Sequence, residues 1–210
     1  MNIISKCCLG SFIYKKAGLQ FNNPFMWSAI WADDFIKLIQ HFEDIDFMNP
    51  ELEKYILNDR EICYSIILDN NIKIHYTHYK QGTKSDNKKI VGNDLYDWRA
   101  YEYTLNQFNE RTARMLNDKS NVCFVILGEM KNVPGYNLKF DTYNLKNLIK
   151  IYEIQTKHKI CIITSFKELL KYQSDRIKII IDEHPKNEKG FWTENFATIY
   201  KDEIIKFAEK

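Results

Sequence analysis

The sequence is poor in the two residues that most often interrupt regular structure, with 7 glycines and 4 prolines among 210 residues. This scarcity excludes collagen-like chains and disordered low-complexity chains, which are enriched in both. Long hydrophobic runs are also absent, since no apolar stretch approaches the ~20 residues that a membrane-spanning helix needs. The N-terminus lacks the basic flank and long apolar segment of a secretory signal. We therefore expect a cytoplasmic protein with no transmembrane segment.

Charge of one sign is not in excess either. The 30 basic and 28 acidic side chains leave a formal net charge of +2, whereas nucleic-acid-binding proteins usually carry a clear basic surplus. Nucleic acid is therefore not an expected partner. Cysteine is scarce, at 5 residues, and Cys63, Cys123 and Cys161 each lie in an apolar strand-like run, where a thiol packs as a small hydrophobe. Disulfides are not expected.

What the sequence does contain is an alternation of strand-like and helical patterns. A hydrophobic content of 45% in a chain of this length fits one domain with a sizeable core. Two β-rich runs flank Asp69–Asn71, which favours a hairpin. Three later β-like runs, NVCFVIL, HKICIIT and RIKIIID, alternate with helical segments. Apolar spacing predicts helices at 33–42, 94–117, 144–154 and 165–172, and a closing helix capped by Thr193.

These patterns predict the fold class. Strands that alternate with helices form layered α/β structures, in which the strands run mostly parallel. We expect a single α/β domain over residues 1–210, with an α/β/α arrangement and a mixed, mostly parallel sheet that includes one β-hairpin.

The opening stretch, NIISKCCLGSFIYKKAGL, predicts a strand at 2–5 and a helix that starts near residues 12–16 and ends at Gly18. Gly10 and Ser11 would lie in the turn between the two elements. Ligands of α/β sheets tend to bind at such places, beyond the carboxyl end of a strand, where helix N-terminal NH groups attract anions.

The residues of this turn suggest two kinds of chemistry. Gly10 would let the chain approach a phosphate closely, Ser11 offers a hydroxyl, and Lys6 adds positive charge. Neither a Walker pattern nor a three-glycine dinucleotide pattern is present, so the alternative is a strand-to-helix turn without a ligand. Cys8 is a candidate nucleophile if a helix N-terminus, a cation or a histidine lowers its pKa. The alternative is a packed thiol.

The segment IHYTHYK places His75 and His78 three residues apart. On a straight strand this spacing points the two side chains to opposite faces. No third histidine or cysteine stands at a zinc-ligand spacing, so no metal site is expected. His78, or His75 if the register is shifted, is a candidate general base, and the alternative is a histidine satisfied within a half-buried sheet. The lysine-rich segment 80–89 is predicted to be a solvated loop and a candidate lid.

The long helix carries the most specific polar cluster. Gln107, Glu110, Arg111 and Arg114 recur at intervals of three and four residues, which places them on one side of the helix. Two arginines together can grip a diphosphate or a carboxylate. The alternative is a surface ladder of ion pairs, because Glu110 and Arg114 stand at the favoured four-residue spacing.

Several motifs, in constant order from about residue 3 to 164, resemble the bacterial DUF1919 family, whose function is unknown and whose members are often labelled exopolysaccharide biosynthesis proteins. SKCCLGS is similar to the family's SNNCWGG, DFIKL to DFIKF, IHYTHY to IHFLHY, and HKICIIT to NKIIFT. The opening motif departs from the family at Lys6, Cys7, Leu9 and Ser11, and keeps Cys8 and Gly10.

The resemblance implies a setting in capsule, exopolysaccharide or lipopolysaccharide assembly. These pathways use activated anionic donors, so we expect a cytoplasmic transferase that moves a sugar or a small substituent from such a donor, for example a nucleotide sugar, to a glycan acceptor. His78 or His75 would deprotonate the acceptor. The donor phosphate would be held by Gly10, Ser11, Gln107, Arg111 and Arg114. Beyond the donor substrate, no cofactor is implied.

Two other functions fit the same residues. The first is a non-catalytic carbohydrate-binding or assembly subunit, with Trp27 and Trp31 as a platform for sugars. The second is a thiol acyltransferase or esterase that uses Cys8 as the nucleophile and His78 as the base.

Overall fold

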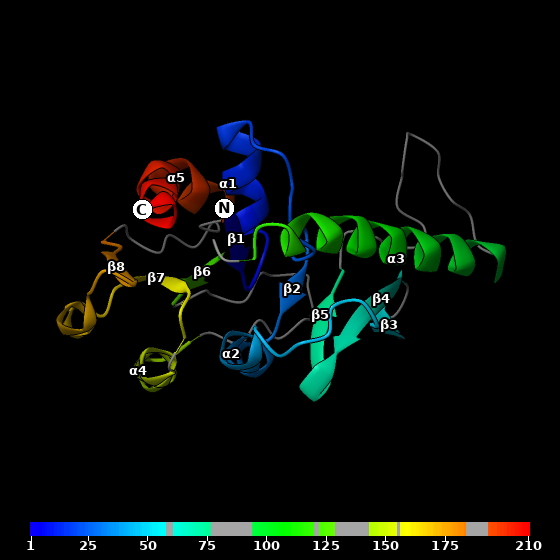
Figure 1. The fold of residues 1–210 in the computed structure, drawn as a ribbon, viewed down its shortest axis with the longest axis horizontal. Coiled ribbons are helices and arrows are strands. Elements are labelled where there is room, and N and C mark those ends of the chain that lie inside the picture. Colours follow the sequence, from blue (N-terminus) through cyan, green and yellow to red (C-terminus); the bar gives the residue numbers. More distant parts are fainter. Residues whose placement is uncertain (58–60, 77–93, 120–121, 129–142, 155, 184–192) are drawn as a thin grey trace.

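The computed structural model describes residues 1–57, 61–76, 94–119, 122–128, 143–154, 156–183 and 193–210. The described strands form two four-stranded sheets (Figure 1). Sheet A is parallel and has the order β1 (Asn2–Ser5), β6 (Val122–Leu127), β7 (Lys159–Thr164), β8 (Ile177–Ile181). Sheet B is antiparallel and has the order β2 (Ala29–Ile30), β5 (Ile72–His75), β4 (Glu61–Leu68), β3 (Glu51–Leu57).

Helices cover both sides of sheet A. Helices α1 and α5 pack against each other on one side, and α2 and α4 lie on the other, while α3 runs along sheet B (Figure 1). None of the helices in the described part of the chain is long and apolar enough to span a membrane. The helix bounds are α1 (Leu9–Ala17), α2 (Ala32–His41), α3 (Asp94–Leu116), α4 (Leu145–Glu153) and α5 (Thr193–Glu209), with short 3₁₀ helices η1 (Asp69–Asn71) and η2 (Lys167–Tyr172).

Side chains along the strands of sheet A point alternately to its two faces, and this divides the core into two clusters. Ile4 and Phe124 face α2 and α4, whereas Ile3 and Cys123 face α1 and α5, as the two-residue period of a strand requires. Cys63, Cys123 and Cys161 are all buried in strands, which confirms the prediction that they pack as hydrophobes.

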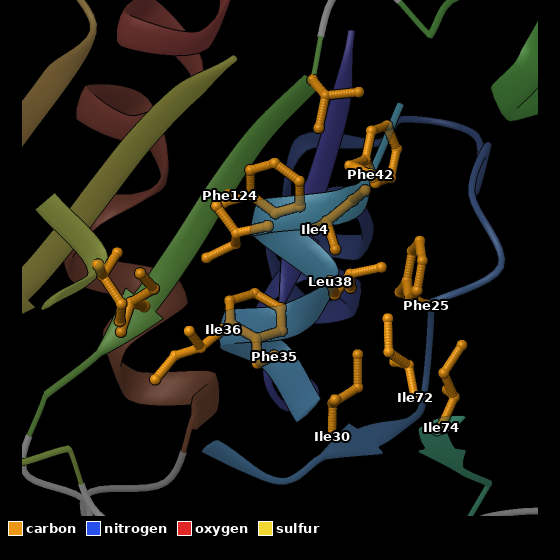
Figure 2. Packing of buried hydrophobic residues seen from close by; sticks show 14 of the residues in the cluster. Ile4, Phe25, Ile30, Phe35, Ile36, Leu38, Phe42, Ile72, Ile74 and Phe124 are labelled. Carbon is orange, nitrogen blue, oxygen red and sulfur yellow. The ribbon is translucent and has the colours of Figure 1, made fainter. Parts of the chain in front are cut away.

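Helix α2 joins the two sheets. Its apolar face is buried between sheet A and sheet B, and Figure 2 shows this face in contact with both. The ring of Phe124 on β6 lies 6.0 Å from the ring of Phe35 and 5.3 Å from that of Phe42. On the sheet B side, the same cluster contains Ile30, Ile66, Ile72 and Ile74.

The α/β class and the predicted hairpin are confirmed. Strands β4 and β5 pair through η1, where Asn70 and Asn71 adopt positive φ angles of 59° and 54°, a conformation that asparagine tolerates better than most residues. The structure differs in one respect, because the antiparallel strands form their own sheet and do not join the parallel one.

The outer edge of β1 explains this separation. The backbone NH of Ile3 donates to the Tyr14 hydroxyl at 3.1 Å, and the Ile3 carbonyl accepts from Asn23 Nδ2 at 3.1 Å. A strand can be added to an edge only where NH and C=O groups are available. Side chains already occupy these groups at Ile3, so the hairpin cannot pair with β1 at this residue.

Candidate functional site

The two sheets meet where β1 ends. Lys6 follows the last residue of β1, and its carbonyl accepts a hydrogen bond of 2.7 Å from the backbone NH of Ile30 in β2. This bond connects the carboxyl end of an outer strand of sheet A to the first strand of sheet B. In α/β proteins the carboxyl ends of parallel strands are the usual place for ligands. We call this region the junction site and define it by Lys6, Trp31, Ser65, His75 and Tyr143.

Lys6 brings a cation into the junction site. Its side chain is 3% exposed, and Nζ lies 4.7 Å from the centre of the Tyr143 ring, which is the geometry of a cation–π contact. The Tyr143 hydroxyl in turn donates to the carbonyl of Ala32 at 3.3 Å. Tyr143 thereby ties the start of α2 to the lysine at the end of β1.

Trp31 lies between the two anchored residues Ile30 and Ala32. It is 40% exposed, and its ring centre is 4.6 Å from that of His75, with an angle of 34° between the planes. The carbonyl of Trp31 accepts from the NH of Phe35 at 2.8 Å, which forms the first turn of α2. The indole is therefore a partly exposed ring on a firmly held piece of backbone.

His75 is buried, and its ring packs against the indole of Trp31. Its Nδ1 is 2.8 Å from the Ser65 hydroxyl, because Ser65 and His75 stand opposite each other in the β4–β5 ladder. Burial lowers the pKa of His75 to about 4, and the positive charge of Lys73 adds to the effect while Glu53 opposes it. At neutral pH the ring is uncharged. A pKa this low makes His75 a weak base, and the geometry suits it better to supporting the indole.

The predicted base His78 and the predicted lid at 80–89 lie outside the described residues.

The turn after β1 differs from its prediction. Helix α1 begins at Leu9, so Gly10 and Ser11 belong to its first turn and do not precede it. The Gly10 NH donates to Ser5 Oγ at 2.8 Å, and a Cβ at Gly10 would lie 3.2 Å from the Ile3 carbonyl. Glycine is needed here because the helix packs closely on its own strand. The prediction that Gly10 and Ser11 form the connecting turn is therefore wrong.

The hydroxyl of Ser11 also forms a hydrogen bond within the protein. It is 1% exposed, and its Oγ accepts from the backbone NH of Trp27 at 2.6 Å. Trp27 has a φ of 60°, a conformation that costs energy in a residue with a side chain. Its indole packs against Phe12 and Phe21, with ring centres 5.2 Å and 6.0 Å away. Trp27 is thus a half-buried packing residue, in contrast to Trp31.

Cys8 is the residue that precedes α1. Burial raises the pKa of its thiol to about 12, and the neighbouring Cys7 adds to the increase. A nucleophilic cysteine needs the opposite shift, because the thiolate is the reactive species. The structure therefore weighs against the thiol-enzyme hypothesis.

Arg111 holds the loop that leads into β2. The guanidinium is 6% exposed and donates from NH1 to the Met26 carbonyl at 3.0 Å and from NH2 to Gln107 Oε1 at 2.9 Å. Phe21 covers it, with the ring centre 5.8 Å from the guanidinium carbon. Gln107 thus acts as a partner of Arg111. Arg114, one turn further along α3, has a buried Nε with no hydrogen-bond partner in the described structure.

Sequence reasoning missed the central pair of the junction site. The sequence indicates Lys6 only as extra charge and gives no signal for Tyr143, because the two residues lie far apart in the chain. Among the described residues, no group of three or more His, Cys, Asp and Glu side chains is placed to hold a metal ion.

Comparison with known families supports the resemblance seen in the motifs. Residues 1–91 match the model of DUF1919, described as a domain of unknown function. The matched region contains β1, α1, all of sheet B and α2, and with them four of the five residues of the junction site. No curated protein matches the chain.

Proposed function

We propose that this chain, whose residues 1–91 match the DUF1919 family model, is a transferase of bacterial surface-glycan synthesis. In this proposal it moves a sugar or a small substituent from an activated anionic donor to a glycan acceptor, in the cytoplasm. The observation that carries the proposal is the junction site, which brings the buried Lys6 and the partly exposed Trp31 to the carboxyl end of β1.

Lys6 is the donor-binding residue in this proposal. The attraction between an ammonium group and a phosphate is much stronger in a water-poor environment than in bulk water, and Lys6 is almost fully buried. Tyr143 stabilises the charge and orients the side chain. In this proposal Lys6 binds the donor phosphate in place of Gly10, Ser11 and Arg111.

The reaction follows from the donor class. The acceptor hydroxyl oxygen forms a bond to the transferred group, the bond between that group and the donor phosphate breaks, and the phosphate leaves with the electron pair. The acceptor proton goes to a general base. His78 remains the predicted base, because His75 is buried beneath Trp31 and has a pKa of about 4.

A thermal-shift screen tests this proposal. The purified protein is tested against nucleotide sugars, free nucleotides, coenzyme A thioesters and short glycans, and the screen is repeated with Lys6→Met. The control is Lys15→Met, which removes the same charge from an exposed position on α1. We expect one donor class to stabilise the wild type and the control but not Lys6→Met. Equal stabilisation of Lys6→Met, or no response to any donor, contradicts the proposal.

A non-catalytic glycan-binding subunit is the second candidate function. The exposure of Trp31 favours this function. An aromatic ring that served only to pack the core would be buried, whereas Trp31 is 40% exposed. In the same screen, stabilisation by glycans without stabilisation by any donor would support this function over the transferase.

A further inference from the structure

Trp31 is built as a fixed platform. The residue before it is anchored through the Ile30 NH to Lys6, and the residue after it through the Ala32 carbonyl to Tyr143. These two bonds hold the backbone on either side of Trp31, one to Lys6 and the other to Tyr143. A ring held in this way loses little further freedom when a ligand stacks on it, and this lowers the entropic cost of binding.

The support beneath the indole is polar and buried. His75 is 4% exposed and Ser65 is fully buried, and burying polar groups is costly unless they are hydrogen-bonded to one another. The bond of 2.8 Å between them fixes the plane of the imidazole, and the imidazole lies against one face of the indole. A leucine or valine pair would fill the same space, but it would leave the angle of the indole undefined. The Ser65–His75 pair therefore orients Trp31.

The surroundings of the exposed part of Trp31 suit a sugar. His75 lies against the indole, and Trp31 remains 40% exposed, which leaves part of the residue available to a ligand. Asp33, two residues along the chain, is exposed in the first turn of α2, and its negative charge disfavours a phosphate in this part of the surface. A pyranose ring offers a flat face of C–H groups for the indole and a rim of hydroxyl donors for a carboxylate. A nucleotide brings a ring and a phosphate, and the phosphate fits less well.

We propose that Trp31 is the stacking platform for a pyranose ring of the glycan, and that His75 is a positioning residue that holds the indole with the help of Ser65. The assignment of this glycan as the acceptor rests on the proposed transferase function, whereas binding of the sugar itself does not. Lys6 and Trp31 then divide the junction site into a place for the anionic donor and a place for the sugar.

The test is direct binding of simple sugars. The probes are the methyl glycosides of glucose, galactose and mannose, together with N-acetylglucosamine and uridine monophosphate. Binding is followed by saturation-transfer NMR and by tryptophan fluorescence at up to 50 mM probe. We expect at least one sugar to receive saturation mainly on one ring face. Its affinity should fall at least tenfold in Trp31→Ala and by no more than about threefold in Trp31→Phe.

A matched control exists on α4, outside the junction site. Tyr152 is 38% exposed and stacks on Tyr172 at 4.1 Å, but both rings belong to surface segments. Tyr152→Ala should leave sugar binding unchanged. For the positioning role, His75→Ala should weaken binding about as much as Trp31→Ala does. His75→Phe, which restores a ring beneath the indole, should recover most of the affinity.

Four outcomes overturn the inference. They are the absence of binding by all sugars, equal binding by Trp31→Ala and the wild type, equal losses in Trp31→Ala and Tyr152→Ala, and displacement of the sugar by uridine monophosphate. If Trp31→Ala fails to fold, Trp31→Phe and His75→Ala decide the question. Failure of the transferase proposal is recognised separately, because it appears as a lack of donor binding while sugars still bind to Trp31.

Discussion

The hydroxyl of Tyr14 should be one of the most important single atoms for the stability of β1. Tyr14 is 1% exposed, and its hydroxyl accepts from the Ile3 NH at 3.1 Å and donates to the Met1 carbonyl at 2.9 Å. Burial raises the pKa of this phenol to about 12, so it stays protonated at all ordinary pH values. The informative change is Tyr14→Phe, which keeps the ring and removes only the oxygen.

The expected loss of unfolding free energy follows from the hydrogen bond that each partner of the Tyr14 hydroxyl loses. Met1 keeps the hydrogen bond from Asn22 Nδ2 at 2.8 Å, so the loss at Met1 is small. The Ile3 NH is buried and would have no partner, which costs roughly 1–3 kcal/mol. For a chain of this size, each kcal/mol lowers the melting temperature by about 2–4 °C.

Two measurements check this prediction. Urea unfolding followed by circular dichroism gives the loss of unfolding free energy, and hydrogen exchange should show faster exchange of the Ile3 amide. Tyr152→Phe, at an exposed tyrosine, should change stability by less than about 0.5 kcal/mol. If Tyr14→Phe is also within 0.5 kcal/mol of the wild type, side chains do not close the edge of β1, and our explanation for the two separate sheets fails.

Three further predictions concern other parts of the chain. Burial lowers the pKa of His158 although its Nε2 is 2.5 Å from Glu43 Oε1, so the folded state binds fewer protons than the unfolded state and stability is lost as pH falls below about 6.5. His158→Gln should reduce the drop in urea midpoint between pH 7.5 and pH 5.5, and an unchanged drop would show that another group is responsible. Because burial raises the pKa of Cys8 to about 12, its thiolate fraction at pH 8 should be far below that of a free thiol. Peptide mapping after brief iodoacetamide treatment should find Cys8 unmodified in the folded protein but modified in the unfolded protein. Gly10→Ala should lower the unfolding free energy by about 1 kcal/mol. The new Cβ would lie 3.2 Å from the Ile3 carbonyl, and the resulting strain of about 1–3 kcal/mol exceeds the gain in helix propensity. Calorimetry that shows increased stability would contradict this.

Local patterns allowed most elements to be predicted. The apolar spacing that defines α2 and α3, and the asparagines of the β4–β5 turn, depend on neighbours within a few residues, and the structure confirms them. The start of α1 is predicted too late because a glycine at position 10 suggests a turn. The structure gives a different reason for this glycine, which is the close approach of the helix to Ile3, seven residues earlier. The two-residue strand β2 is too short to produce a periodic signal.

The candidate site was less predictable for a physical reason. Arg111 was recognised as a polar feature of α3, but its hydrogen bond to Met26 joins residues 85 positions apart. The stacking of Trp31 on His75 depends in the same way on the pairing of β2 with β5. Single-sequence patterns report which residues share a face of one element. They do not report which elements meet.

The covered edge of β1 has a consequence for synthesis of the chain. Asn2 pairs with Val122, so β1 leaves the ribosome roughly 6–24 s before its partner at translation rates of about 5–20 residues per second. During this interval an apolar strand with open backbone groups could recruit strands of other nascent chains. Tyr14 and Asn23, which cover the outer edge at Ile3, follow β1 closely in the chain and are translated long before β6. They can protect that edge from the start, and only the edge that β6 will occupy remains open.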